Sequence, residues 1–148
     1  MQLASLGIRL YKLFESHKRK FIYIPLASYW LLIFVLTSIP GKSLPKVFLG
    51  LTDKAKHFGA YLLLSFLLNL ALHFQKKYKF LTKKSAISTL LIVSLYGILD
   101  EIHQIFIPGR YFELFDFLAD VLGAIFGILI SHWIIQQNKK IISYNEEL

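Results

Sequence analysis

Four apolar stretches of about twenty residues each constrain this chain more than any other feature. They run through residues 21–40, 56–74, 86–107 and 112–135. A helix needs roughly 20 residues to cross about 30 Å of hydrocarbon, so each stretch has the length of one membrane span. The chain has 148 residues, and a hydrophobic fraction of 55% is high for a soluble domain of that length. We therefore predict an all-α polytopic membrane protein whose four transmembrane helices form one compact bundle, with residues 1–148 as a single domain.

The distribution of Lys and Arg predicts the orientation of this bundle. Twelve basic residues lie in the leader 1–20, in the loop after the second stretch and in the tail: Arg9, Lys12, Lys18, Arg19, Lys20, Lys76, Lys77, Lys79, Lys83, Lys84, Lys139 and Lys140. The other five are Lys42, Lys46, Lys54, Lys56 and Arg110. Cytoplasmic loops carry an excess of Lys and Arg, so we expect both termini inside and the first and third loops outside.

The leader 1–20 has apolar residues at helical spacing, namely Leu3, Leu6, Leu10 and Phe14. This spacing is typical of a short amphipathic helix on the inner membrane surface, and an irregular basic tail is the alternative. The net charge of +8 does not indicate nucleic-acid binding, because the basic residues are spread between apolar stretches and no nucleic-acid motif accompanies them. The absence of cysteine excludes disulfides, thiolate nucleophiles and cysteine metal sites.

Acidic residues are concentrated in the outward half of the predicted bundle. Six of the nine carboxylates lie there: Asp53, Asp100, Glu101, Glu113, Asp116 and Asp120. Each ionised acid near a bilayer centre costs about 2.5–3.5 kcal/mol on insertion scales, so such groups are expected to be paired, hydrated, protonated or functional. At about 1.5 Å per residue, Asp100 lies roughly 12 Å below Pro108, and Asp120 and Tyr61 lie at a similar depth.

The helical period places these groups toward one another. On the fourth stretch, Glu113, Asp116, Asp120, Gly123 and Gly127 fall within an arc of about 80°. The two glycines have GxxxG spacing, which allows close helix approach, so the acids on the same stripe should also face the bundle. The other two stretches each carry a polar face: Asp53, His57 and Tyr61 on the second, and Tyr96, Asp100, His103 and Gln104 on the third, with Glu101 beside them. We predict a polar pocket that opens outward.

Three chemistries could use this pocket. Asp100, Asp116 and Asp120 could hold a divalent cation, with His57 or His103 as a nitrogen ligand. Repulsion between neighbouring carboxylates could instead keep a proton on one of them, which would then serve as a general acid or a relay. The third chemistry is capture of a phosphate head group by basic side chains.

Lys54 and Arg110 are the basic residues predicted to hold such a phosphate, Arg110 by paired hydrogen bonds. A structural alternative stays open, in which both residues neutralise carboxylates and hold the helix ends together. Asp53 has a structural alternative of its own, as a helix cap at the positive end of the second helix. The sequence contains no G-x-S-x-G motif, no P-loop and no Ser/His/Asp arrangement, so it identifies no bond-breaking chemistry.

At these residues the chain resembles the VanZ-like family of small bacterial membrane proteins. The matching motifs are Asp53-Lys54-x-x-His57-Phe58-x-x-Tyr61 and Asp100-Glu101-x-His103-Gln104-x-x-x-Pro108-Gly109-Arg110, followed by Asp116, Asp120, Gly123 and Gly127. The resemblance covers about residues 38–130, and position 120 departs from it, since many relatives carry Asn there. The resemblance implies a location in the bacterial plasma membrane. The family's namesake is linked to resistance to teicoplanin and related glycopeptides, which bind peptidoglycan precursors outside the cell.

From these observations we predict a membrane protein that binds an outer-leaflet or cell-wall precursor head group, with a role in glycopeptide resistance. The expected ligand-binding residues are Asp53, Lys54, His57, Tyr61, Asp100, Glu101, Gln104, Arg110, Asp116 and Asp120. One alternative is a metal-dependent membrane enzyme that acts on a lipid or glycan head group. Another is a small ion- or proton-coupled transporter, which at this size would need a homo-oligomer. The bilayer is the expected partner, and a divalent cation is the one cofactor that the residues suggest.

Overall fold

The computed structural model of the chain describes residues 2–40 and 52–146, and every regular element within them is helical. The elements are α1 (Gln2–Ser16), the π-helical turn η1 (Arg19–Tyr23), α2 (Ile24–Thr37), α3 (Asp53–Phe74), α4 (Lys79–Lys83), α5 (Ser85–Gln104) and α6 (Leu114–Glu146). Four described stretches are long and apolar enough to cross a membrane: Arg19–Thr37, Asp53–Phe74, Ser85–Gln104 and Leu114–Gln137. The predicted all-α membrane protein with four candidate spans is confirmed.

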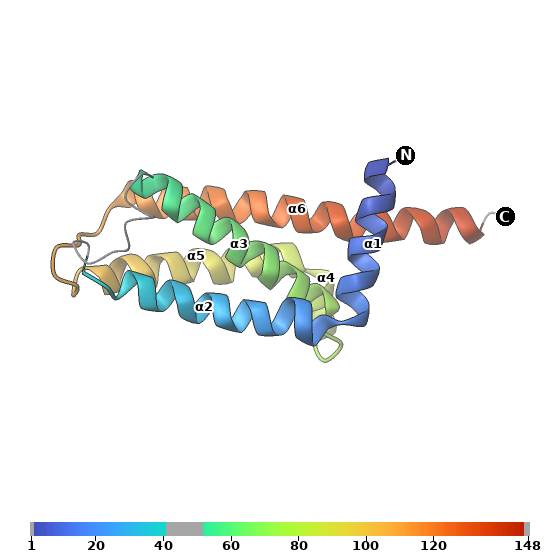
Figure 1. Cartoon of the computed structure of the whole chain (residues 1–148), viewed down its shortest axis with the longest axis horizontal. Coiled ribbons are helices and arrows are strands. Elements are labelled where there is room, and N and C mark those ends of the chain that lie inside the picture. Colours follow the sequence, from blue (N-terminus) through green and yellow to red (C-terminus); the bar gives the residue numbers. More distant parts are fainter. Residues whose placement is uncertain (1, 41–51, 147–148) are drawn as a thin grey trace.

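The four long helices α2, α3, α5 and α6 run lengthwise beside one another, and α1 lies across the end of the bundle that carries α4 (Figure 1). Tyr11 of α1 packs against Phe74 of α3 with a centroid separation of 5.0 Å. Gly7 lies directly against α6, since an added Cβ would be 2.5 Å from the side chain of Gln137. The leader is therefore a helix packed onto the bundle, and its position on the inner membrane surface stays a prediction.

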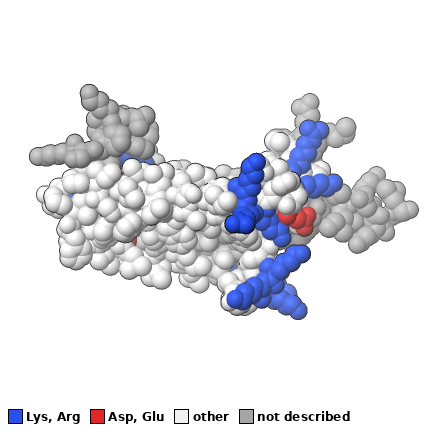
Figure 2. Space-filling view, turned by 60° about the horizontal axis from the view of Figure 1, so that its bottom comes forward, with Lys and Arg blue, Asp and Glu red and all other residues white. Residues whose placement is uncertain are grey.

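Basic side chains gather at this same end of the molecule, around α1 and α4 (Figure 2). In the sequence, basic residues lie within and directly beside η1 and α4. The grouping agrees with the charge asymmetry from which we predict that this end faces the cytoplasm. Lys42 and Lys46, which entered that prediction for the opposite side, lie outside the described residues.

The closest helix contact is between α3 and α6. A Cβ added to Gly123 would lie 2.2 Å from the backbone oxygen of Phe58, and one added to Gly127 would lie 2.1 Å from that of Leu62. Only a glycine lets the two backbones come this near, as the GxxxG spacing predicts. The contact fixes the N-terminal half of α6 against the first turns of α3.

A small polar layer crosses the half of the bundle that is nearer α4. Asn69 of α3 donates a 2.7 Å hydrogen bond to Ser131 of α6, and Thr89 of α5 donates a 3.5 Å bond back to Asn69. All three side chains are fully buried. Polar side chains inside a membrane bundle contribute on average about 0.6 kcal/mol per interhelical hydrogen bond, so this layer specifies which helices meet more than it adds stability.

Helix α2 is attached to the rest of the bundle by fewer contacts than the other spans. Ile33 is buried against α3, and the hydroxyl of Tyr29 donates a 3.3 Å bond to the backbone of Ala60. Large apolar side chains such as Leu31 and Phe34 are exposed, as expected for a surface that faces lipid. Gaps between α2 and α3 follow from this loose packing.

Candidate functional site

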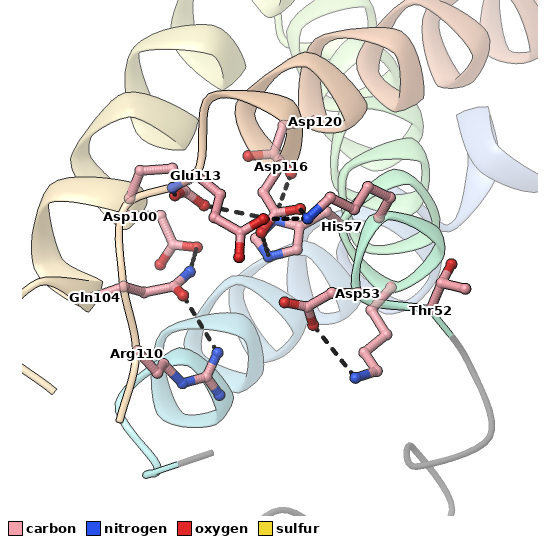
Figure 3. Close-up of polar contacts among 12 residues, drawn as sticks. Thr52, Asp53, His57, Asp100, Gln104, Arg110, Glu113, Asp116 and Asp120 are labelled. Atoms are coloured by element: carbon pink, nitrogen blue, oxygen red, sulfur yellow. Dashed lines mark hydrogen bonds and ion pairs between the residues drawn. The ribbon is translucent and has the colours of Figure 1, made fainter. Parts of the chain in front are cut away.

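His57, on the second turn of α3, lies at the centre of a group of buried carboxylates (Figure 3). Its Nδ1 is 2.9 Å from Asp120 Oδ1 and 3.8 Å from Glu101 Oε1, and its Nε2 is 3.9 Å from Asp116 Oδ2. None of the three acids is more than 3% exposed. We call Glu101, Asp116 and Asp120 the acid cluster; it joins α5 and α6 around a residue of α3.

Glu101 has two different surroundings at its two oxygens. Oε2 accepts a 2.9 Å hydrogen bond from the backbone N–H of Glu113, the residue before α6 begins, and so satisfies one of the free donors at that helix end. Oε1 accepts no hydrogen bond among the described residues, and neither does Asp120 Oδ2. Glu113 itself lies outside α6 and is exposed, so the acidic stripe of that helix begins at Asp116.

Lys54 approaches the acid cluster from the solvent side. Its ammonium group pairs with Glu113 and with Asp116 Oδ1, the latter at 2.9 Å. Lys54 therefore neutralises carboxylates, which is the structural alternative considered for it. Isolated buried charges are strongly unfavourable, and His57 and Lys54 are the basic side chains that contact the acid cluster among the described residues.

Arg110 does not contact the acid cluster, and its side chain lies at the end of α2. It donates to the backbone oxygens of Ile39 (3.0 Å) and Leu36 (3.1 Å) at the end of α2, and to the side chain of Gln104 (3.3 Å). Gln104 in turn donates a 3.4 Å bond to Asp100. Carbonyls at a helix end lack partners within the helix, so Arg110 ties the α5–α6 connection to α2. That connection turns at Gly109, whose φ of +77° favours glycine.

The start of α3 differs in detail from the alternative considered for Asp53. Thr52 is the N-cap, and its side chain accepts a 3.3 Å bond from the backbone N–H of Ala55. Asp53 is the first residue inside the helix and pairs with Lys56 at 3.3 Å. Asp53 is not the cap, because a threonine one residue earlier provides the oxygen that reaches the free backbone donor. Its carboxylate does lie in the first turn, at the positive end of the helix.

Tyr61 is 1% exposed and stacks on Tyr96 with ring centroids 6.0 Å apart. The hydroxyl groups of both rings are buried without a hydrogen-bond partner in the described residues. His103, considered as a metal ligand, turns toward α2 instead, where Nε2 lies 3.0 Å from Ser38 Oγ and the ring stacks on Phe34. It takes no part in the acid cluster.

A cavity of about 330 Å³ lies between α2 and α3 near these groups. Its wall on α2 is mostly apolar, and its charged lining comes from α3, α5 and the α5–α6 connection. The lining residues are Tyr29, Leu32, Ile33, Leu36, Thr37, Asp53, Ala55, Lys56, His57, Gly59, Ala60, Tyr61, Asp100 and Arg110. We call this space the α2–α3 cavity. His57 belongs both to its lining and to the group around the acid cluster.

The ten residues expected from the sequence therefore fall into two adjoining groups. Those that line the α2–α3 cavity are Asp53, His57, Tyr61, Asp100 and Arg110, and those at or beside the acid cluster are Lys54, His57, Glu101, Asp116 and Asp120. Gln104 links the first group to the α5–α6 connection.

Lys56 and the contribution of α2 to the site were not predicted from the sequence. Helical spacing contains a signal for Lys56: two residues correspond to about 200° of rotation, so Lys54 and Lys56 point to opposite sides of α3. The apolar sequence of α2 contains no comparable signal, because nearly every residue on it suits lipid and core alike.

Comparison with known proteins agrees with the motifs. No curated protein and no solved structure matches the chain. The profile of the protein family described as VanZ/LLP1 matches residues 8–135, which include all four candidate spans up to the last turn of the fourth and every residue of the site described above. The chain belongs to the VanZ/LLP1 family.

Proposed function

We propose that the protein binds an amphiphile of the outer membrane leaflet, with a phosphate head group at the polar end of the α2–α3 cavity. The observation that carries this proposal is the composition of the cavity wall. Leu32, Ile33 and Leu36 offer an apolar surface on α2, while Lys56 and Arg110 provide positive charge. A cell-wall lipid precursor, with a phosphate on a long hydrocarbon chain, has the complementary chemistry.

The space between α2 and α3 continues beyond this cavity toward the end of the bundle that carries α4. A second, more open hollow of about 360 Å³ lies there, and it shares Tyr29 and Leu32 with the first. Its other lining residues are Pro25, Ser28, Leu63 and Leu67. Ligand sites commonly occupy about 300–1,000 Å³, so the first cavity accommodates a head group and the hollow accommodates part of a chain.

The two basic side chains of the α2–α3 cavity have more hydrogen-bond donors than their contacts with described residues use. Lys56 uses its ammonium group for one bond to Asp53, and Arg110 uses three of its donors on backbone and amide oxygens. An ammonium group has three donors and a guanidinium five, so both can also bind phosphate oxygens. Lys54 does not line the cavity and is paired with two acids, so we assign the phosphate contact to Lys56 and Arg110.

The charge asymmetry supports an orientation in which α1 and α4 lie in the cytoplasm and the acid cluster faces outward. In the plasma membrane of a bacterium, the α2–α3 cavity would then open to the outer leaflet. Glycopeptides of the teicoplanin type bind peptidoglycan precursors outside the cell. A protein that holds such a precursor would change what the drug can reach, and we propose this as the route to resistance.

Binding is tested by titrating the purified protein in detergent micelles with a polyprenyl monophosphate and with the corresponding polyprenol, by calorimetry. We expect the phosphate to bind and Lys56→Gln to weaken it about tenfold or more, since a hydrogen bond to a charged group contributes about 1.5–3 kcal/mol. Lys79→Gln on α4 makes the same change in net charge and should leave affinity unchanged. Equal binding of phosphate and alcohol, or equal losses in the two variants, would contradict the proposal.

Occupancy of the α2–α3 cavity is tested separately by filling it. Gly59 lines the cavity, and an added Cβ would meet nothing within 4 Å. Gly59→Phe should therefore fold and exclude the polyprenyl monophosphate. The resistance role is tested by teicoplanin susceptibility of bacteria that express the wild type or Lys56→Gln; unchanged susceptibility with the wild type would refute that role and leave lipid binding as it stands.

A further inference from the structure

The group around His57 contains more negative charge than its neighbours balance. Three buried carboxylates face one imidazole, and within residues 2–40 and 52–146 the one lysine that reaches them is shared with a fourth acid, Glu113. Glu101 is 0% exposed and Asp120 is 1% exposed. Each has one oxygen that accepts no hydrogen bond in the described residues. Buried carboxylate oxygens without partners are rare, and a bound cation is one of the explanations that chemistry offers.

The positions of these atoms suit a metal ion. One ligand atom each from His57, Glu101 and Asp120 can be chosen so that all three lie within 4.8 Å of one another. First-row divalent ions bind imidazole nitrogen and carboxylate oxygen at about 2.0–2.2 Å, so two ligands of one ion lie no more than about 4.4 Å apart. The Nδ1 distances of 2.9 Å and 3.8 Å already fall inside that limit.

The opposite side of the imidazole has a suitable partner as well. His57 Nε2 faces Asp116 Oδ2 at 3.9 Å, and Lys54 holds the other oxygen of Asp116 at 2.9 Å. Histidines that bind metals commonly direct their second nitrogen to a carboxylate, which fixes the ring and raises its basicity as a ligand. Asp116 is placed to orient the ring in this way, with Lys54 restraining the carboxylate.

We propose that His57, Glu101 and Asp120 form a binding site for a divalent first-row transition-metal ion such as Mn²⁺ or Zn²⁺. The single nitrogen ligand distinguishes this class from Mg²⁺ and Ca²⁺, which prefer oxygen alone. Three protein ligands leave coordination positions for water or for a ligand oxygen. The inference goes beyond the proposed function and is independent of it, because the chain alone supplies the ligands and no lipid is needed.

The test uses the full chain in detergent micelles, stripped with a chelator and titrated with Mn²⁺ while free Mn²⁺ is followed by electron paramagnetic resonance. We expect one ion per chain, and affinity at least about tenfold weaker in Glu101→Gln and Asp120→Asn. Pulsed measurements on the bound ion should detect one coupled nitrogen, which His57→Gln removes. Asp53→Asn is the matched control, since Asp53 belongs to a second, overlapping group with His57 and Asp116 and should not affect this site.

Several results would overturn the proposal. Absence of stoichiometric binding of Mn²⁺ or Zn²⁺ by the folded wild type at millimolar concentrations is one, and bound Mn²⁺ without a coupled nitrogen is another. Loss of the ion in Asp53→Asn with retention in Glu101→Gln would place it in the other group. Circular dichroism and gel filtration show whether each variant folds. If a variant does not fold, the nitrogen coupling measured on Mn²⁺ bound to the wild type decides whether His57 is a ligand.

Discussion

Replacing Gly123 by alanine should separate α3 from α6 at the level of the site. The added methyl group would lie 2.2 Å from the backbone oxygen of Phe58, whereas real Cβ contacts below 3.0 Å are essentially never seen. The helices must therefore move apart by about 0.8 Å at this point, because neither atom is at the end of a flexible side chain. Phe58 follows His57 directly, so the same movement acts on the site.

The size of the effect combines two opposing contributions. Forcing an extra methyl group into a packed interface typically costs about 1–3 kcal/mol. Alanine in place of glycine gains about 1 kcal/mol of helix propensity. An approach of 2.2 Å to a backbone oxygen places the cost in the upper part of that range, about 2–3 kcal/mol. We therefore expect Gly123→Ala to lower the free energy of unfolding by about 1–2 kcal/mol. A displacement of about 0.8 Å would also lengthen the 2.9 Å contact of His57 with Asp120 beyond hydrogen-bonding range.

The assay is reversible unfolding in mixed detergent micelles of increasing dodecyl sulfate content, followed by far-ultraviolet circular dichroism. Gly59→Ala is the matched control: it is the same substitution on α3, but the new methyl group meets nothing within 4 Å. It should be neutral or stabilise by up to about 1 kcal/mol. If Gly123→Ala is as stable as the wild type, or if Gly59→Ala loses as much, the inferred backbone contact is wrong.

Three further predictions concern topology, the α2 attachment and the polar layer. Because the chain has no cysteine, Tyr111→Cys should react with an impermeant maleimide in intact cells and Lys77→Cys only after lysis; the reverse pattern would invert the orientation. Arg110→Ala removes three hydrogen bonds, so it should destabilise by about 2–3 kcal/mol and speed hydrogen exchange at the end of α2, and unchanged exchange would show that α2 is held elsewhere. Ser131→Ala deprives Asn69 of its acceptor and should cost about 0.6–1.7 kcal/mol in the same micelle assay, whereas a loss above about 3 kcal/mol would mean that the layer does more than pair helices.

The spans and the meeting of polar groups were accessible from sequence because both depend on regular helical geometry. Length and apolar character define the spans, and the rise of 1.5 Å with a period of 3.6 residues places Asp100 and Asp120 at one level. The ends of the helices differ from the ends of the apolar stretches. α5 ends at Gln104 and not at residue 107, and α3 begins at Asp53 and not at residue 56, because side chains at the ends bind carbonyls and amides that hydropathy does not register.

The division of the site residues into two groups could not be predicted from the sequence. It depends on how each helix is rotated about its own axis, and that rotation is set by tertiary contacts. The backbone contact of Gly123 with Phe58 brings His57 to Asp120, and the bond from Glu101 to the backbone of Glu113 fixes where α6 starts. Neither contact follows from the period of a single helix.

The crosswise contact of α1 with α6 defines a distance along α6, from the contact point to the acid cluster. Gly7 touches α6 at Gln137, and 21 residues separate Gln137 from Asp116, which corresponds to about 32 Å of helix. This is close to the thickness of a hydrocarbon layer of about 30 Å. If α1 lies on one face of the bilayer, it fixes the depth of α6 in the membrane. The carboxylates near the other end of α6 then lie level with the lipid phosphates of the opposite leaflet. One additional helical turn in this part of α6 would move the carboxylates about 5.4 Å away from the level of the head groups. The length of helix between the α1 contact and the acid cluster therefore matters for function.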